Sequence, residues 1–216
     1  MKTLYIDSSR KNLVVAIADS NNIIFVSNTE SYYRHSNFLM NEIIRALNST
    51  KLDIKDINNI VVLNGPGSFT GVRVGVTIAK TLAWSLNKNI YSLTTLEALS
   101  LQCSDSVVIS VISDKSNFGY VGMYKGEKKE ENYYDASEII DVINNENVTI
   151  VCLEEDEFVD KLYKGLSNKN KVTIKVIKDY DYLKVISKAI SKEALNPHLV
   201  EPIYLKKIDA EKKICD

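Results

Sequence analysis

The chain has 216 residues, of which 45% are hydrophobic and 25% are charged, and its formal net charge is −1. This length and composition are typical of a globular protein with one large domain or two small lobes. Proteins that bind nucleic acid unaided usually carry a basic surplus, so the near-neutral charge predicts no independent nucleic-acid binding.

The cysteines and the apolar runs indicate where such a protein works. Cys103, Cys152 and Cys215 are scattered and form no CxxC pair, which predicts reduced thiols and not a disulfide framework. Asp7 interrupts the apolar start of the chain, so we expect no signal peptide. No run approaches the ~20 apolar residues that span a bilayer. We therefore expect a cytoplasmic protein without membrane attachment.

The first part of the chain predicts three strands and a helix. Apolar stretches at residues 3–7, 13–18 and 23–27 are separated by short breaks rich in turn-forming residues, which indicates an antiparallel meander. Residues 35–49 then predict an amphipathic helix. Its apolar stripe consists of Leu39, Met40, Ile43, Ile44 and Leu47.

A strand at residues 60–63, a glycine-rich loop and a helix at residues 71–86 follow. The loop consists of Gly65, Pro66, Gly67, Ser68, Phe69, Thr70 and Gly71. Backbone N–H groups at a helix start can hold an anion, yet the spacing fits neither the GxxxxGK[ST] nor the GxGxxG nucleotide motif. Two interpretations stay open: a contact with an anion or a partner, and a tight turn without a ligand.

The second half of the chain begins like the first. After a strand at 90–93 and a helix at 95–102, we expect strands at 107–112, 120–124, 148–153 and 172–177, and helices at 139–143, 158–166 and 183–194. Two strand-rich starts, each ending in an aspartate (Asp7 and Asp114), suggest duplicated lobes. We predict lobes at residues 1–104 and 105–195, and a tail at 196–216 that packs back on a lobe.

The run GPGSFTGVRVGVTIAKTLAWSL, followed by LTTLEAL, resembles the signature of the TsaB (YeaZ) family. Further landmarks occur in the family's order: IDSS from Ile6, RHS from Arg34, Asp114 before YVGMY from Tyr120, and PIYLK from Pro202. The first hundred residues resemble the family closely and the remainder loosely. The resemblance implies an α/β protein with the actin-like ATPase (ribonuclease-H-like) fold, with two tandem lobes that each have a mixed sheet flanked by helices.

TsaB proteins are non-catalytic subunits of the bacterial machinery that makes N6-threonylcarbamoyladenosine (t6A) in tRNA. The resemblance implies a scaffold that binds and activates the transferase TsaD as a heterodimer, with TsaE as a further partner. TsaD transfers the threonylcarbamoyl group from threonylcarbamoyl-adenylate to the tRNA adenosine. A homodimer is expected for the isolated chain, tRNA would be held only through the complex, and no cofactor is implied.

In the family, two helices of the first lobe contact the partner, and here these are residues 35–49 and 71–86. The interface residues that this implies are Phe38, Asn41, Glu42, Arg45, Arg73, Thr77 and Lys80. A solvated helix face is the alternative. Trp84 stays open between the core and a partner surface.

Actin-like ATPases and sugar kinases hold ATP with loops that combine aspartate and glycine. Asp7, Ser8 and Ser9 occupy the place of the first loop and Asp114 that of the second, but neither place has the expected glycine, and the chain has no Gly-Gly pair. The resemblance therefore implies a degenerate nucleotide site and no enzyme activity. We interpret Asp7 as a carboxylate that caps a nearby loop.

Metal and peptidase chemistry lack the residues they need. The only histidines, His35 and His198, are far apart, and Thr95 and Leu99 stand, by resemblance, where TsaD has its metal-binding HxxxH pair. Ser68 is not in a GxSxG elbow. Three alternatives to the scaffold stay open: a small actin-fold ATPase or kinase, a cryptic peptidase, and a subunit that binds ADP or ATP without hydrolysis.

Overall fold

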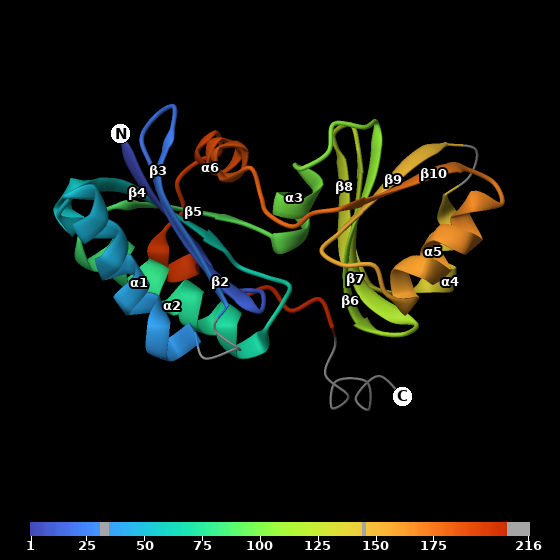
Figure 1. Ribbon diagram of the computed structural model, residues 1–216, viewed down its shortest axis with the longest axis horizontal. Coiled ribbons are helices and arrows are strands. Elements are labelled where there is room, and N and C mark those ends of the chain that lie inside the picture. Colours follow the sequence, from blue (N-terminus) through green and yellow to red (C-terminus); the bar gives the residue numbers. More distant parts are fainter. Residues whose placement is uncertain (31–34, 144–145, 207–216) are drawn as a thin grey trace. The chain divides into compact units, whose positions relative to one another are not determined.

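The computed structural model describes residues 1–30, 35–143 and 146–206. These residues form two compact units, each built on a five-stranded sheet (Figure 1). The first unit comprises residues 1–95 and 181–203, and the second comprises residues 96–180 and the chain from Tyr204 onward. The landmark residue Arg34 and Cys215 lie outside the described residues.

The sheet of the first unit contains the predicted meander. Strands β1 (Lys2–Asp7), β2 (Asn12–Ala18) and β3 (Ile23–Glu30) are antiparallel, and β4 (Ile57–Leu63) and β5 (Asn89–Leu93) add parallel to β1. The resulting order is β3-β2-β1-β4-β5. The central strands are nearly continuous apolar runs because helices cover both of their faces.

Helices α1 (His35–Thr50) and α2 (Phe69–Ser85) lie side by side on one face of this sheet, and α6 (Tyr182–Ile190) covers the other (Figure 1). Leu4 and Ile6 of β1 belong to the core under α1 and α2. Tyr5 packs against Tyr182 of α6, with 5.6 Å between ring centroids. The alternation along β1 therefore attaches helices to both faces of the sheet.

The second unit repeats the order of strand types. Strands β6 (Val107–Lys115), β7 (Phe118–Lys125) and β8 (Lys128–Asp135) are antiparallel, and β9 (Asn147–Cys152) and β10 (Lys171–Val176) are parallel to β6. The order is β10-β9-β6-β7-β8. Two sheets of three antiparallel and two parallel strands confirm the predicted mixed-sheet architecture.

The helices of the second unit are α3 (Thr95–Ser100), which begins at the last residue of the first unit, α4 (Ala136–Val142) and α5 (Glu157–Ser167). Two single-turn 3-10 helices, η1 (Ile54–Asp56) and η2 (Pro197–Leu199), complete the described elements. None of the described helices combines the length and apolar character needed to cross a bilayer.

The two units divide the chain differently from the predicted lobes. Helix α6 and the segment up to residue 203 belong to the first unit, although the sequence placed them in the second lobe and the tail. The reason is a set of contacts between residues far apart in sequence: Leu195 pairs with Ile90 of β5, and Val200 is buried in the first core.

Strand β8 is a second difference, because the sequence analysis assigned no element to its residues. Its sequence KKEENYYD has no apolar alternation, yet it pairs with β7 along its whole length. A charged strand at the edge of a sheet does not need an apolar face to form once a hairpin sets its register.

Candidate functional site

Helix α1 exposes more apolar surface than its sequence predicts. Met40 and Ile44 were assigned to the core stripe, but they are 41% and 50% exposed. The helix packs on β2 and β3 with one side only, so this part of the stripe faces solvent. Phe38, Asn41 and Arg45 are exposed as expected. The buried positions are Leu39, Ile43, Ala46 and Leu47.

Helix α2 exposes an aromatic residue at each end. Phe69 is 56% exposed and Trp84 is 65% exposed, and Arg73 and Thr77 lie between them on the same side of the helix. The Arg73 guanidinium carbon lies 3.7 Å from the centroid of the Phe69 ring. Trp84, which the sequence left open, is therefore a surface residue. The core-facing positions are Val72, Val76, Ala79 and Ala83.

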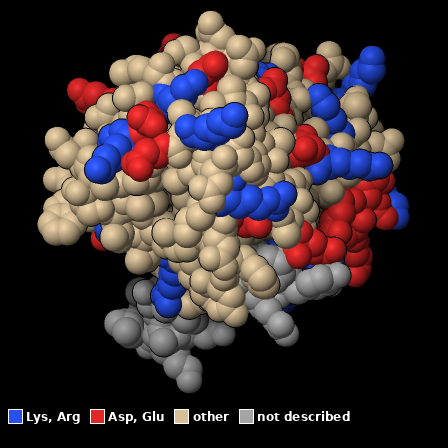
Figure 2. Space-filling view, turned by 60° about the vertical axis from the view of Figure 1, so that its left-hand side comes forward, with Lys and Arg blue, Asp and Glu red and all other residues tan. Residues whose placement is uncertain are grey.

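We name the exposed large apolar side chains of the two helices, taken together, the helical face. It consists of Phe38, Met40, Ile44, Phe69 and Trp84. Next to it, the ring of His198 from η2 lies at 6.0 Å from Trp84, and Leu199 is 76% exposed. Figure 2 shows a side of the molecule on which uncharged side chains form broad areas between groups of charged ones.

Glu42 and Lys80, two of the expected interface residues, make contacts within the first unit. Glu42 accepts a hydrogen bond of 2.5 Å from the Ser27 hydroxyl and pairs with Arg45 at 3.2 Å. The Lys80 ammonium donates to the carbonyls of His198 and Val200, at 3.2 and 3.1 Å. These two side chains therefore hold neighbouring segments in place, and an interface role for any of the seven residues stays a prediction.

The glycine-rich loop packs directly on the turn between β1 and β2. A Cβ atom on Gly67 would lie 2.2 Å from the Ser9 carbonyl oxygen, and that oxygen accepts a hydrogen bond of 2.6 Å from Ser68 N–H. One turn into α2, a Cβ atom on Gly75 would lie 2.2 Å from the Ser8 hydroxyl. Gly67 is needed because two backbones approach each other closely, and Gly75 leaves room for the Ser8 side chain.

The hydrogen bonds of the loop favour the tight-turn interpretation. Ser68 is the N-cap of α2, and its side chain accepts from Gly71 N–H. The N–H groups of Ser68 and Gly71 are thus engaged within the protein. Gly65 accepts from Thr95 N–H, and the Gly65–Pro66 peptide is cis. Pro66 is buried and Thr70 is exposed. Anion binding by this loop stays a prediction.

Asp7 is fully buried and both of its carboxylate oxygens are engaged. One oxygen accepts from the Ser9 backbone N–H at 2.9 Å and from the Ser9 hydroxyl at 2.6 Å, and the other accepts from Arg10 Nε at 2.9 Å. This geometry agrees with the interpretation of Asp7 as a loop-capping carboxylate. The sequence analysis missed Arg10, although a cation three residues after the carboxylate was a readable signal.

Asp114 is also paired with a cation of its own chain. It accepts hydrogen bonds from the Tyr133 hydroxyl at 2.8 Å and from the Lys206 ammonium at 2.6 Å. Partial burial raises the pKa of Asp114, but the bonds from Lys206 and Tyr133 outweigh burial and lower the pKa below its usual value. Lys206 belongs to the PIYLK landmark, so the residue was visible in the sequence and its contact was not.

The structure shows where the residues that were considered for metal and peptidase chemistry lie. Within residues 1–30, 35–143 and 146–206, no three His, Cys, Asp or Glu side chains gather in a way that could hold a metal ion. Thr95 and Leu99 are fully buried. The Ser68 hydroxyl oxygen caps α2, and the ring of His198 lies against Trp84.

Comparison with known proteins finds relatives whose names refer to tRNA modification. Residues 28–130 match the family model "TsaD: tRNA N6-adenosine threonylcarbamoyltransferase". The chain is 35% identical over 127 residues to the "tRNA threonylcarbamoyladenosine biosynthesis protein TsaB" of Bacillus subtilis, covering 58% of this chain and 56% of the relative. It is 31% identical over 97 residues to TsaB of Buchnera aphidicola subsp. Schizaphis graminum, covering 45% and 46%. The match spans about half the length of these relatives.

Solved structures share the fold over nearly the whole chain. An uncharacterised Pseudomonas aeruginosa protein with similarity to peptidase YEAZ has a TM-score of 0.77 at 16% identity, covering 95% of this chain and 99% of that one. YeaZ from P. aeruginosa has a TM-score of 0.73 at 15% identity, covering 94% and 99%. A ROK hexokinase from Thermus thermophilus has a TM-score of 0.52 at 8% identity, covering 88% and 98%. These likenesses confirm the predicted actin-like fold class.

A methyl group at Gly67 tests the contact between the loop and the turn. The variant Gly67→Ala must push apart two backbones that share a hydrogen bond, so we expect it to lower the free energy of unfolding by about 1–3 kcal/mol. Urea titration followed by circular dichroism measures this value. The control Thr70→Ala changes an exposed residue of the same loop and should cost about 0.5 kcal/mol or less. Equal effects of the two variants would contradict the close contact.

The reactivity of the Cys103 and Cys152 thiols tests whether Cys152 is buried in the second unit. Burial, followed by the charges of Glu155, Asp156 and Glu154, raises the pKa of Cys152 to about 11. Because the thiolate is the reactive form, only about one Cys152 thiol in a thousand is reactive at pH 8. We expect iodoacetamide to label the partly exposed Cys103 in the native protein and Cys152 only after unfolding, as read by peptide mass spectrometry. Labelling of Cys152 as fast as Cys103 would contradict this environment.

Proposed function

This chain belongs to the TsaB (YeaZ) family, and from that membership we propose that it is a non-catalytic subunit of the bacterial machinery that makes t6A in tRNA. It binds and activates the threonylcarbamoyltransferase TsaD as a heterodimer, and TsaE docks on the pair. tRNA is held through the complex and not by this chain alone, which agrees with its net charge of −1. The protein acts in the cytoplasm.

The observation that carries the proposal is the helical face. Five large apolar side chains on two adjacent helices are exposed, and a group of this kind on a soluble domain marks an interaction surface. Tryptophan and other aromatic residues dominate the binding energy of protein interfaces. Arg73, stacked on Phe69, adds a guanidinium suited to directional contacts with a partner's carboxylate. The same surface serves the homodimer when TsaD is absent.

The environments of Asp7 and Asp114 support a role without catalysis. In the nucleotide-binding enzymes of this fold, such carboxylates face phosphates and their metal ion. Here one is fully buried against Arg10 and the other is paired with Lys206. A nucleotide would have to displace a cation of the chain itself from each of them.

Charge placed on the helical face should break the complex with TsaD. The variants Ile44→Glu and Trp84→Glu would each bury a carboxylate in an apolar interface, and we expect each to weaken binding by at least about 2 kcal/mol, or roughly thirtyfold. Calorimetry with TsaD from the same organism measures the affinity, and circular dichroism checks the fold. The matched control Val142→Glu alters an exposed apolar residue of α4 in the second unit. Unchanged binding by both face variants, or equal weakening by the control, would contradict the proposal.

The activity itself is tested by tRNA modification with TsaD, in the presence and the absence of this chain. We expect modification to depend on the chain, and the pure chain to modify no tRNA and to turn over no ATP. ATP turnover that Asp7→Asn abolishes would instead favour the small ATPase or kinase. Labelling of Ser68 by a serine-reactive probe would favour the peptidase, and calorimetric binding of ADP or ATP without turnover would favour a nucleotide-binding subunit.

A further inference from the structure

In the second unit, the Lys206 ammonium group lies next to both the carboxylate of Asp114 and the aromatic ring of Tyr133. The Lys206 ammonium donates to a carboxylate oxygen of Asp114 at 2.6 Å and lies 5.0 Å from the centroid of the Tyr133 ring. The Tyr133 hydroxyl donates to the same Asp114 oxygen at 2.8 Å. Carboxylate and ring therefore act on the same cation, and Tyr133 also fixes the carboxylate.

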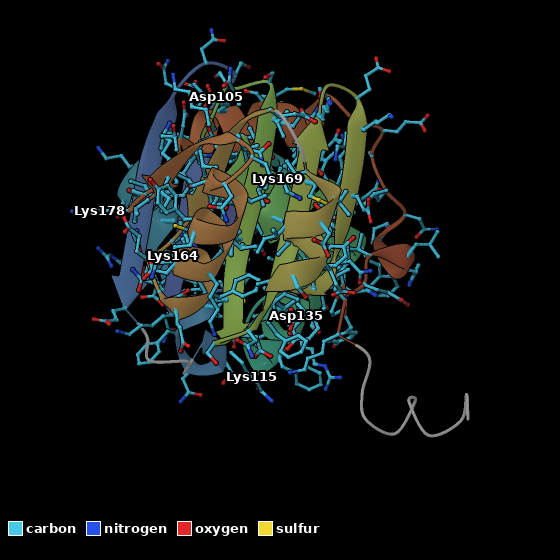
Figure 3. The ribbon with its side chains drawn as sticks, turned by 90° about the vertical axis from the view of Figure 1, so that its right-hand side faces the viewer. Asp105, Lys115, Asp135, Lys164, Lys169 and Lys178 are labelled. Atoms are coloured by element: carbon cyan, nitrogen blue, oxygen red, sulfur yellow. The ribbon has the colours of Figure 1, made fainter. Side chains whose placement is uncertain are left out.

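The Tyr133 ring packs against aromatic side chains of the neighbouring strand β7. Tyr133 of β8 is the cross-strand partner of Tyr120 of β7, and their ring centroids are 5.2 Å apart. On β7 as well, Phe118 stacks on Tyr133 with 5.7 Å between centroids and 7° between ring planes. Figure 3 shows Lys115 and Asp135 at this end of the second unit's sheet, and Asp105 at the opposite end. Three rings on two paired strands form a rigid support.

This combination is the chemistry that recognises an ammonium ion. A carboxylate supplies a charge-assisted hydrogen bond, and the face of an aromatic ring attracts a cation. The hydrogen bond that Lys206 donates to Asp114 raises the pKa of Lys206 and outweighs the opposite effect of burial. Both partners therefore keep their charges at neutral pH. An isolated surface ion pair would contribute little, but here the ion pair, the ring contact and the second hydrogen bond converge on one site.

We propose that Asp114 and Tyr133, the latter supported by Tyr120 and Phe118, form a site for a primary ammonium group, occupied in this structure by the chain's own Lys206. Occupation holds the C-terminal segment on the second unit. The segment before it is held elsewhere, since Ile203 N–H donates to the Asn64 carbonyl at 2.8 Å within the first unit. Lys206 therefore anchors residues 204–206 to the second unit. The proposal does not rest on the proposed function, because it concerns the isolated chain.

The first test measures how firmly Lys206 holds the segment that contains Tyr204. Chymotrypsin cleaves after Tyr204, which is half exposed, and faster cleavage reports release of the segment. Asp114→Asn leaves the cleaved sequence intact, and we expect cleavage to be at least about fivefold faster than in the unchanged protein. Lys206→Gln should behave in the same way. The control Lys115→Ala removes a neighbouring lysine that makes no hydrogen bond to Asp114 among the described residues, and it should leave the rate unchanged. No acceleration by Asp114→Asn, or equal acceleration by Lys115→Ala, would overturn the anchor.

The second test measures the ligand class. Lys206→Ala removes three carbons and the ammonium group, so propylammonium is the matching probe. We expect millimolar propylammonium to raise the melting temperature of Lys206→Ala, and propan-1-ol to have no effect. The unchanged protein, whose site is filled, and the double variant Lys206→Ala with Asp114→Asn should not respond. Stabilisation of all three proteins alike, or of none, would overturn the ammonium site. Neither outcome bears on the complex with TsaD.

Discussion

The close contact between the glycine-rich loop and the β1–β2 turn decides how the first unit is built. Because Gly67 and Gly75 have no side chains, α2 comes near enough to β1 for Val72 and Val76 to enter the core. The same orientation turns Phe69 and Trp84 to solvent. The core-facing side of α2 and its part of the helical face are therefore opposite sides of one helix, and a change that moves α2 outward affects both. This links a loop that resembles a ligand site to a surface suited to a protein partner.

The duplicated architecture keeps an aspartate at the end of the first strand of one unit and near the end of the first strand of the other, but the chain supplies its own cation to each. Arg10 binds Asp7 from the adjacent turn, and Lys206 binds Asp114 across 92 positions of sequence. Asp7 is fully buried and Asp114 is partly buried, and because leaving such a carboxylate unpaired is costly, each internal cation stabilises the residue with which it pairs. The fold that this chain shares with a sugar kinase is thus compatible with carboxylates at these two positions that pair with cations of the same chain.

Local patterns in the sequence were enough for the strands of the first sheet and for the loop, since β1, β2 and β4 are apolar runs bounded by turn residues. They were not enough for β8, whose charged sequence forms a strand only because β7 is beside it. Periodicity also placed Met40 and Ile44 in the core, because it cannot show how wide a face the sheet covers. The placement of α6 and the partner of Asp114 depend on contacts between distant residues, and no single-sequence pattern encodes these. The actin-like fold and the proposed role in t6A synthesis were predicted from the family resemblance.

The charge pattern of the second unit also bears on where partners bind. An edge strand presents unpaired backbone groups that can pair with another chain, and charged side chains oppose this pairing. Strand β8 carries Lys128, Lys129, Glu130 and Glu131, and β10 carries Lys171 and Lys175. Both edges of this sheet are thus protected against association through strands. The helical face of the first unit is the surface that we propose for a partner, and burial of large side chains there, not backbone pairing, would supply the binding energy.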